Sequence, residues 1–352
     1  MSQLLFAETF GLDESVMTTA TIQAANGDYI LSGRVYGEVD KAIAIRIDPS
    51  GNLVWENVYS SDYSVFFTSI TQLVDGTFIA IGSYFYSNMS GDEFIWVVRL
   101  DAMGRKIWEK TLGNKEEQND GYDVVATSDG GFVVTGLVLD KKTYQPQTWV
   151  IKFDKNCNQQ WDKLFESGIA FAVIQTQDGG YALSGAHNLT GSLNSNVYVL
   201  RLDSQGNMLW EKILPDYQVY VLLESGITED GNGNLIVAAK TVLMQLDASG
   251  NVIWARQNGN FGLNSVIQMP DGTYAIGGSL NVNYYDHAYV AVIDKQGEKI
   301  IWDNTEILYP SGISGILVNF DGLLTGGGYG PVNLNDSLMF LAVFNPAGTV
   351  AL

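Results

Sequence analysis

The chain has 352 residues, of which 46% are apolar and 16% charged, and its net charge at pH 7 is −20. This composition excludes disordered, collagen-like and coiled-coil chains, and the acidity argues against nucleic acid and anionic membranes as partners, since both need a basic footprint. One cysteine and two histidines exclude an internal disulfide, a cysteine-based metal cluster and a three-histidine zinc site. We therefore expect neither a metal nor a cofactor.

No apolar run approaches the roughly 20 residues that a transmembrane helix needs, so we expect no membrane insertion. The first eight residues contain no basic region, and their apolar stretch is too short for a signal peptide. Two compartments stay open. The protein is cytoplasmic if Met1 is the native start, and it is secreted or on the cell surface if a leader was removed.

An Asp-Gly or Asn-Gly turn, followed by an apolar run, recurs along the chain at steps of 39 to 54 residues. The turns are Asn26-Gly27, Asp75-Gly76, Asp129-Gly130, Asp178-Gly179, Asn232-Gly233, Asp271-Gly272 and Asp321-Gly322. Repetition at such a period indicates a fold built from repeated supersecondary units. Seven units fit into the chain.

A second turn, Asp-x-x-Gly-x-x-x-Trp, follows within the repeat. It occurs at Asp48–Trp55, Asp101–Trp108, Asp203–Trp210 and Asp247–Trp254, with Cys157 replacing Gly in Asp154–Trp161 and one extra residue in Asp294–Trp302. The segments between turns are short β-rich runs without a helical period. Four antiparallel strands per repeat predict an all-β, seven-bladed β-propeller that forms a single domain over residues 1–352.

The two ends of the chain are expected to share one blade. The seventh repeat ends before its outer strand, and residues 6–11 align with the outer strand at 108–113. We therefore expect Leu4–Phe10 to pair with the last blade and close the ring, which removes an open sheet edge.

Small residues recur at two positions of the repeat. One column holds Gly33, Gly82, Gly136, Gly185, Ala239, Gly278 and Gly327; the other holds Ala20, Ser69, Asp123, Ala172, Gly226, Ser265 and Gly315. We expect both columns where strands of neighbouring blades crowd together.

Charged residues also recur in pairs. A basic residue lies two positions before the second-turn Asp, at Arg46, Arg99, Lys152 and Arg201, and an acid follows the Trp, at Glu56, Glu109, Asp162 and Glu211. The fifth repeat lacks both charges, with Gln245 and Ala255 in their places. This joint presence and absence predicts cross-strand ion pairs.

The run Leu-Asp-Ser-Gln-Gly-Asn-Met-Leu-Trp-Glu-Lys at 202–212, with the Asp-Gly-Gly-Tyr type of turn, resembles bacterial and archaeal β-propeller repeat proteins of that consensus. Many of those proteins are secreted or on the cell surface and have no assigned activity. The Asp–Gly–Trp element also resembles the tryptophan-docking motif of quinoprotein propellers, although their extra residue before Trp is found only in Asp294–Trp302. The resemblance covers essentially the whole chain and implies the fold, but no cofactor-specific constellation supports a quinoprotein, and propellers host many unrelated activities.

The strand order places both tight turns of each repeat on one face. The opposite face, which we call the long-loop face, carries the variable loops, where function is usually found. Its aromatic and polar residues predict a non-catalytic recognition scaffold for a peptide, glycan, protein or small molecule. The expected ligand-binding residues are Tyr84, Tyr86, Tyr144, His187, Asp216, Tyr217, Tyr284 and His287.

A small-molecule enzyme with its site at the channel mouth of the same face stays open as an alternative. Its acid–base candidates are Asp123, His187, Asp286 and His287, because a carboxylate near the channel and groups that titrate near neutrality suit proton transfer. The competing interpretation is a structurally bonded Asp123 and solvated histidines. Two candidates within hydrogen-bond reach across a pocket would favour catalysis.

The fifth repeat has only a two-residue hairpin, Lys240-Thr241, where other repeats have longer loops. This predicts a notch in the long-loop face at the fifth blade. His187 and His287 are expected on its two walls, with Asp216 and Tyr217 at its floor, so that a ligand there contacts the fourth and sixth blades.

Overall fold

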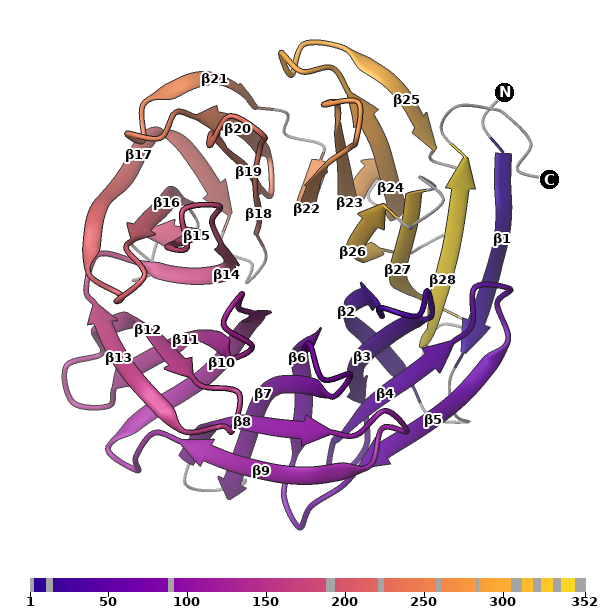
Figure 1. Cartoon of the computed structure of the whole chain (residues 1–352), viewed down its shortest axis with the longest axis vertical. Helices are drawn as coiled ribbons and strands as arrows, with labels where there is room; N and C mark the ends of the chain where they lie inside the picture. The colour runs from indigo at the N-terminus through magenta and orange to yellow at the C-terminus, as the bar shows by residue number, and fades with distance from the viewer. Residues whose placement is uncertain are drawn as a thin grey trace.

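The computed structural model describes residues 3–10, 15–87, 92–187, 194–220, 225–257, 261–282, 285–304, 312–318, 324–331 and 337–345. The strands in these ranges, β1 to β28, form seven antiparallel four-stranded sheets arranged as blades around a central axis (Figure 1). Each sheet corresponds to one of the sequence repeats. The all-β propeller with four antiparallel strands per blade is thus confirmed.

Blades are numbered here in chain order. Blade 1 holds β2 (Val16–Gln23), β3 (Tyr29–Val35), β4 (Lys41–Ile47) and β5 (Leu53–Tyr59). Blade 2 holds β6 (Val65–Gln72), β7 (Phe78–Ser87), β8 (Asp92–Leu100) and β9 (Lys106–Leu112). Blade 3 holds β10 (Glu117–Ala126), β11 (Phe132–Asp140), β12 (Pro146–Phe153) and β13 (Gln159–Phe165). Blade 4 holds β14 (Ile169–Gln175), β15 (Tyr181–His187), β16 (Asn194–Leu202) and β17 (Met208–Tyr220).

Blade 5 holds β18 (Gly226–Glu229), β19 (Leu235–Ala239), β20 (Val242–Leu246) and β21 (Val252–Gln257). Blade 6 holds β22 (Phe261–Gln268), β23 (Tyr274–Val282), β24 (Tyr285–Ile293) and β25 (Ile300–Asn304). Blade 7 holds β26 (Gly312–Val318), β27 (Leu324–Pro331), β28 (Ser337–Asn345) and β1 (Gln3–Phe10). The described residues include no helix that is long and apolar enough to cross a membrane.

The ring closes through both its innermost and its outermost strands. Each first strand of a blade contacts the first strand of the next blade, and β26 contacts β2. The strand order of blade 7 is β26-β27-β28-β1, with Phe6 opposite Val343 and Phe10 opposite Met339 (Figure 1). The N-terminal strand therefore supplies the outer strand of the last blade, as its alignment predicts.

The first column of small residues, from Gly33 to Gly327, was expected to lie where neighbouring blades crowd together. The structure shows a different cause. The first strand of six blades carries a β-bulge, for example between Phe67 and Ser69. A Cβ on Gly82 would overlap the carbonyl oxygen of Phe66, in the bulged strand of the same blade. The crowding is therefore within a blade. Blade 5 tolerates Ala239 because β18 begins at Gly226, which pairs with Ala238 without a bulge.

The second column does lie between blades. Its members cross the interfaces with main-chain and hydroxyl contacts: the Ser265 hydroxyl accepts a hydrogen bond from the Ile316 N–H at 3.2 Å, and a Cβ on Gly226 would lie 2.8 Å from Ser265. This part of the expectation is confirmed.

The predicted ion pairs are wrong in their partners. Arg46 lies opposite Trp55, and Glu56 lies opposite Ile45, so that the two charges point to opposite faces of the sheet. Arg46 binds Asp28 of the tight turn instead, at 2.6 Å. In blades 2 to 4 the basic residue likewise binds the Asp of the tight turn and not the acid after the Trp. The pairs are Arg99–Asp75, Lys152–Asp129 and Arg201–Asp178. In blade 5 the buried Gln245 donates to Asp230 at 2.9 Å, so a neutral donor replaces the cation.

Four of the repeat tryptophans join their own blade to the next one. The Trp55 ring packs on Gly104 of blade 2, where a Cβ would lie 2.8 Å from the ring, and its Nε1 donates to the Ala102 carbonyl at 3.2 Å. Trp161, Trp210 and Trp254 pack on Gly206, Gly250 and Gly297 in the same way. These glycines have φ between +67° and +79°, which also favours glycine.

Candidate functional site

An aromatic pocket opens in the half of blade 2 that lies toward the long-loop face. It has a volume of about 590 Å³. Its lining consists of Tyr84, Phe94, Trp96, Glu109, Lys110, Thr111 and Lys115. We call it the blade-2 pocket. Of the tyrosines predicted for ligand binding, Tyr84 is the one that lines it.

Strand alternation places these side chains together. Tyr84 on β7 lies directly opposite Phe94 on β8, and Trp96, two residues on, lies opposite Thr111 on β9. Residues two apart on a strand share a face of the sheet. Phe94 and Trp96 thus face blade 1, whereas Glu93 and Ile95 face blade 3.

Packed rings support the pocket from beneath. Trp96 stacks on Phe67 with ring centroids 5.3 Å apart, and Tyr63 meets Tyr84 edge-on at 6.4 Å. Trp96 is only 3% exposed, so its ring is fixed in the wall, whereas Tyr84 and Phe94 remain partly exposed. Rigid aromatic walls of this kind bind apolar groups at little entropic cost.

The rim of the pocket is polar and carries both the Glu109 carboxylate and Lys115. Glu109 accepts hydrogen bonds from Trp96 Nε1 at 2.9 Å and from Lys106 Nζ at 2.8 Å. Burial acts to raise the pKa of Glu109, but these two hydrogen bonds outweigh it and lower the pKa. Lys110 Nζ lies 5.6 Å from the Phe153 ring centroid, and Lys115 borders the opening.

The charge of the chain is distributed unevenly around this pocket. Residues 99–163 contain ten basic and ten acidic residues, so the net charge of −20 arises from the rest of the chain. The stretch that carries β9 and most of blade 3 is therefore neutral overall. An anionic group is repelled less there than by the acidic remainder of the chain.

A carboxyl pair, the buried Glu93 and the half-buried Asp120, lies behind the pocket at the interface of blades 2 and 3. The two side chains hydrogen-bond to each other, and Gln118 Nε2 donates to Glu93 at 2.9 Å and to Asp120 at 3.3 Å. The Ser83 hydroxyl donates to Asp120 at 3.0 Å. Burial, with the hydrogen bond and the charge of Asp120, raises the pKa of Glu93 to about 9. Glu93 is thus the member of the pair that carries a proton at neutral pH.

Asp123 joins three blades. Its carboxylate accepts hydrogen bonds from the Ser69 hydroxyl at 2.7 Å, the Val124 N–H at 2.8 Å and the Val173 N–H at 2.9 Å. Burial raises the pKa of Asp123 to about 6, although these hydrogen bonds act in the opposite direction. His187 is engaged separately, because its Nδ1 donates to the Ser167 carbonyl. The structure therefore does not join Asp123 and His187 as an acid–base pair.

The other candidates differ in what the structure shows. Tyr144 is 68% exposed in the turn after β11, and Tyr217 packs against the core between blades 4 and 5. His287 is partly exposed on β24, opposite Leu280. Tyr284 and the side chains of Tyr86, Asp216 and Asp286 lie outside the described residues. Their roles in binding or catalysis stay predictions.

The short hairpin of blade 5 is confirmed. Lys240 and Thr241 alone connect β19 and β20, and Lys240 has φ of +50°. Lys240 and Leu263 exchange two backbone hydrogen bonds of 2.7 Å, which tie the hairpin to the first strand of blade 6. A ligand site at this point stays a prediction.

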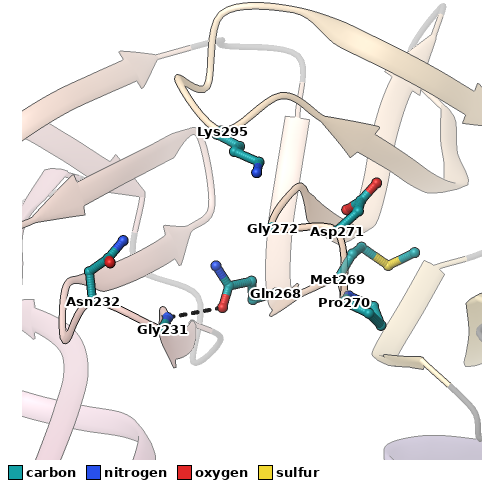
Figure 2. Close-up of a pocket in the computed structure, with 8 residues that line it drawn as sticks. All are labelled: Gly231, Asn232, Gln268, Met269, Pro270, Asp271, Gly272 and Lys295. Carbon is teal, nitrogen blue, oxygen red and sulfur yellow. Dashed lines mark hydrogen bonds between the residues drawn. The ribbon is translucent and has the colours of Figure 1, made fainter.

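A second hollow, of about 500 Å³, lies on the tight-turn face between blades 5 and 6. Figure 2 shows Gln268 reaching from blade 6 to the Gly231 N–H of blade 5, at 3.1 Å. Equivalent hydrogen bonds link Ala25 to Gln72, Ser128 to Gln175 and Gln177 to Glu229. This hollow is therefore one instance of a repeated joint between blades.

Sequence reasoning missed Phe94, Trp96 and Lys115, although one signal was present. Trp96 and Trp149 are the two tryptophans outside the repeat position. Both donate through Nε1 to the acid after the repeat Trp, Glu109 at 2.9 Å and Asp162 at 3.0 Å. Among the described residues, no three His, Cys, Asp or Glu side chains are grouped as a metal ion would require.

No family model matches the chain, and no curated protein matches it in sequence. Solved structures do match. The WD40 β-propeller domain of Doa1 aligns with a TM-score of 0.62 at 11% identity, over 98% of this chain and 97% of that one. A protein of unknown function from Dyadobacter fermentans gives 0.59 at 9% identity, over 98% and 99%. The Dos1 propeller gives 0.57 at 12% identity, over 93% and 77%.

These comparisons show the fold alone, because all the identities are low. They also correct the family assignment. The resemblance to bacterial and archaeal propellers with the Leu-Asp…Trp-Glu-Lys consensus does not hold as membership of a family, since no family model matches. The repeated motif instead marks structural positions in each blade, namely the tight turn and the docked tryptophan.

Proposed function

We propose that the chain is a recognition scaffold whose blade-2 pocket binds a peptide segment of a partner protein, with an apolar side chain beside an acidic group. The observation that carries this proposal is the pairing of Tyr84 and Phe94 with a lysine-bordered rim. An apolar side chain would insert between the rings, and the acidic group would meet the ammonium group of Lys115. Buried anchors supply most of the affinity in such sites, while charge adds specificity.

The same geometry favours a peptide over a glycan. Sugar rings stack on freely exposed aromatic faces, whereas the Trp96 ring is stacked on Phe67 and buried in the wall. Catalysis at the channel mouth has less support, since Asp123 and His187 make their hydrogen bonds with different residues. The proposal places the ligand on blade 2 and not over the blade 5 hairpin.

The test is binding to a random peptide library and to a glycan array, followed by affinity measurements on the selected ligands. Tyr84→Ala should weaken peptide binding at least about tenfold, because it removes half of the ring pair. Lys115→Glu should weaken binding of acidic peptides and reduce or reverse the loss of affinity with added salt, because a screened attraction is replaced by a repulsion. The matched control is Tyr144→Ala, which removes an exposed tyrosine of the neighbouring blade and should leave binding unchanged.

Each variant must retain the wild-type melting temperature for the comparison to hold. Selection of sugars instead of peptides would contradict the proposal. Peptides that keep their affinity for Tyr84→Ala and Lys115→Glu, or that contact blades 4 and 6, would also do so.

A further inference from the structure

The start of β8 connects two features that lie on opposite faces of blade 2. Phe94 lines the blade-2 pocket, and the adjacent Glu93 is hydrogen-bonded to Asp120 of blade 3. Asn119 Nδ2 also donates to the Glu93 carbonyl at 3.3 Å, so main chain and side chain of this residue are both bound to β10. A change in the carboxyl pair must therefore act on the residue that precedes Phe94.

We propose that the carboxyl proton of Glu93, hydrogen-bonded to Asp120, is a latch that fixes the start of β8 and thereby the wall of the blade-2 pocket. The inference concerns regulation of that pocket and rests on the proposed function. With the proton present, the Glu93 hydroxyl donates to the Asp120 carboxylate. When the proton leaves to solvent, two carboxylates remain in a poorly solvated interface and repel each other.

The groups around the pair do not neutralise a second negative charge. On β7 the neighbour is the Ser83 hydroxyl, and on β10 it is the Gln118 amide, both of which donate hydrogen bonds to the pair. Tyr122 on β10 has its pKa raised by burial and by Asp120 and Glu93, so it stays neutral. Ser83 and Gln118 already donate these hydrogen bonds when Glu93 is protonated, so neither offers a further hydrogen bond to a second negative charge.

Two nearby lysines, Lys141 and Lys142, are bound to other groups. Lys141 Nζ of the blade 3 loop binds Asp92 at 2.8 Å and the Lys115 carbonyl at 3.1 Å. Lys142 binds Glu116 at 3.1 Å. The Glu117 carboxylate accepts from Asn114 at 2.8 Å. Loss of the proton is therefore relieved by movement, and the start of β8 is the place for it, since Ile95 and Val97 are fully buried farther along the strand.

The experiment follows Trp96 in the pocket wall by fluorine NMR. The full chain is labelled with 5-fluorotryptophan, and the Trp96 signal is assigned by its loss in Trp96→Phe. Between pH 6 and 9.5, the signal of the wild-type protein should titrate with a midpoint well above the ordinary carboxyl range, because burial and Asp120 raise the pKa of Glu93 to about 9. In Glu93→Gln, which keeps the shape and removes the titrating proton, the signal should not move with pH.

If the Glu93–Asp120 pair positions the pocket wall, the midpoint of the Trp96 titration should also depend on the charge of Asp120. Asp120→Asn removes the neighbouring negative charge, so the midpoint should fall by about one pH unit or more. A purely structural contact would not shift it. Glu116→Gln is the matched control, since it alters an exposed glutamate that binds Lys142, and it should leave the midpoint unchanged. A flat wild-type signal, or a titration that persists in Glu93→Gln, would overturn the latch.

This test needs no ligand. If the library selects no peptide but the Trp96 signal titrates as described, the proposed function fails and the proton latch stands as a property of blade 2. If peptides bind through Tyr84 but the signal is flat, the latch alone is overturned.

Discussion

Replacing Gly82 by alanine should destabilise the protein by on the order of 3 kcal/mol. The added Cβ would overlap the Phe66 carbonyl oxygen at the bulge of the first strand. A backbone atom within a sheet cannot rotate away as a side chain can, so either the bulge or the ladder must be disrupted. Urea denaturation at pH 7 measures the loss as a lower midpoint at unchanged slope.

Two other glycines separate this clash from conformational strain. Gly231→Ala meets no atom within 4 Å and should leave stability nearly unchanged. Gly76→Ala also meets nothing within 4 Å, but its φ of +83° should cost roughly 1–2 kcal/mol. A Gly82→Ala protein as stable as Gly231→Ala would show that the bulge does not determine the glycine column.

Replacing Gln245 by glutamate should destabilise blade 5 by on the order of 3–5 kcal/mol at neutral pH. Gln245 is 7% exposed and donates to Asp230, which is 2% exposed, at 2.9 Å. The glutamate would bring a second carboxylate to a buried carboxylate and would remove the donor. Its pKa in the folded protein would be raised above the unfolded value, so the lost stability should return as the pH falls toward the unfolded pKa.

The matched control for this change is Gln245→Arg. It restores the cation that Arg46, Arg99, Lys152 and Arg201 supply in blades 1 to 4. We expect its stability to lie within about 1 kcal/mol of wild type, since a buried ion pair that is well bonded roughly offsets its desolvation. The melting temperatures of both variants, measured from pH 4 to 8 and compared with wild type, test this. The difference from wild type should shrink at low pH for Gln245→Glu and stay small throughout for Gln245→Arg. Equal pH profiles for Gln245→Glu and Gln245→Arg would contradict the explanation.

The fold could be predicted because its determinants are local and repeated. The glycines of the tight turns, Gly27 and Gly76, have φ of +93° and +83°. Asn-Gly and Asp-Gly dipeptides are typical of turns that need such positive φ values, so the sequence alone predicts these turns. Strand closure was also predictable, since the N-terminal segment aligns with an outer strand that the seventh repeat lacks. Each of these inferences needs only sequence spacing.

The ion pairs and the site could not be predicted in this way, because they depend on sheet faces. Arg46 and Glu56 miss each other by one position in the ladder, and a one-residue offset reverses the face of a side chain. Similarly, nothing local shows that Glu93 meets Asp120 of another blade while Phe94 faces the pocket. Tyr84 was predicted from the loop that follows it, whereas the positions of Phe94 and Trp96 beside it depend on the strand register.

The pairing of β1 with β28 has a consequence for how the chain folds. Every other neighbouring pair of strands within a blade is a hairpin of consecutive segments, whereas Phe6 and Val343 are more than 300 residues apart. Bringing such distant segments together in an unstructured chain costs roughly 3–4 kcal/mol more than closing a short hairpin. Blades 1 to 6 can each form from local contacts, so β1 should dock last. Under mechanical pulling from the N-terminus, β1 should likewise be the first strand to detach.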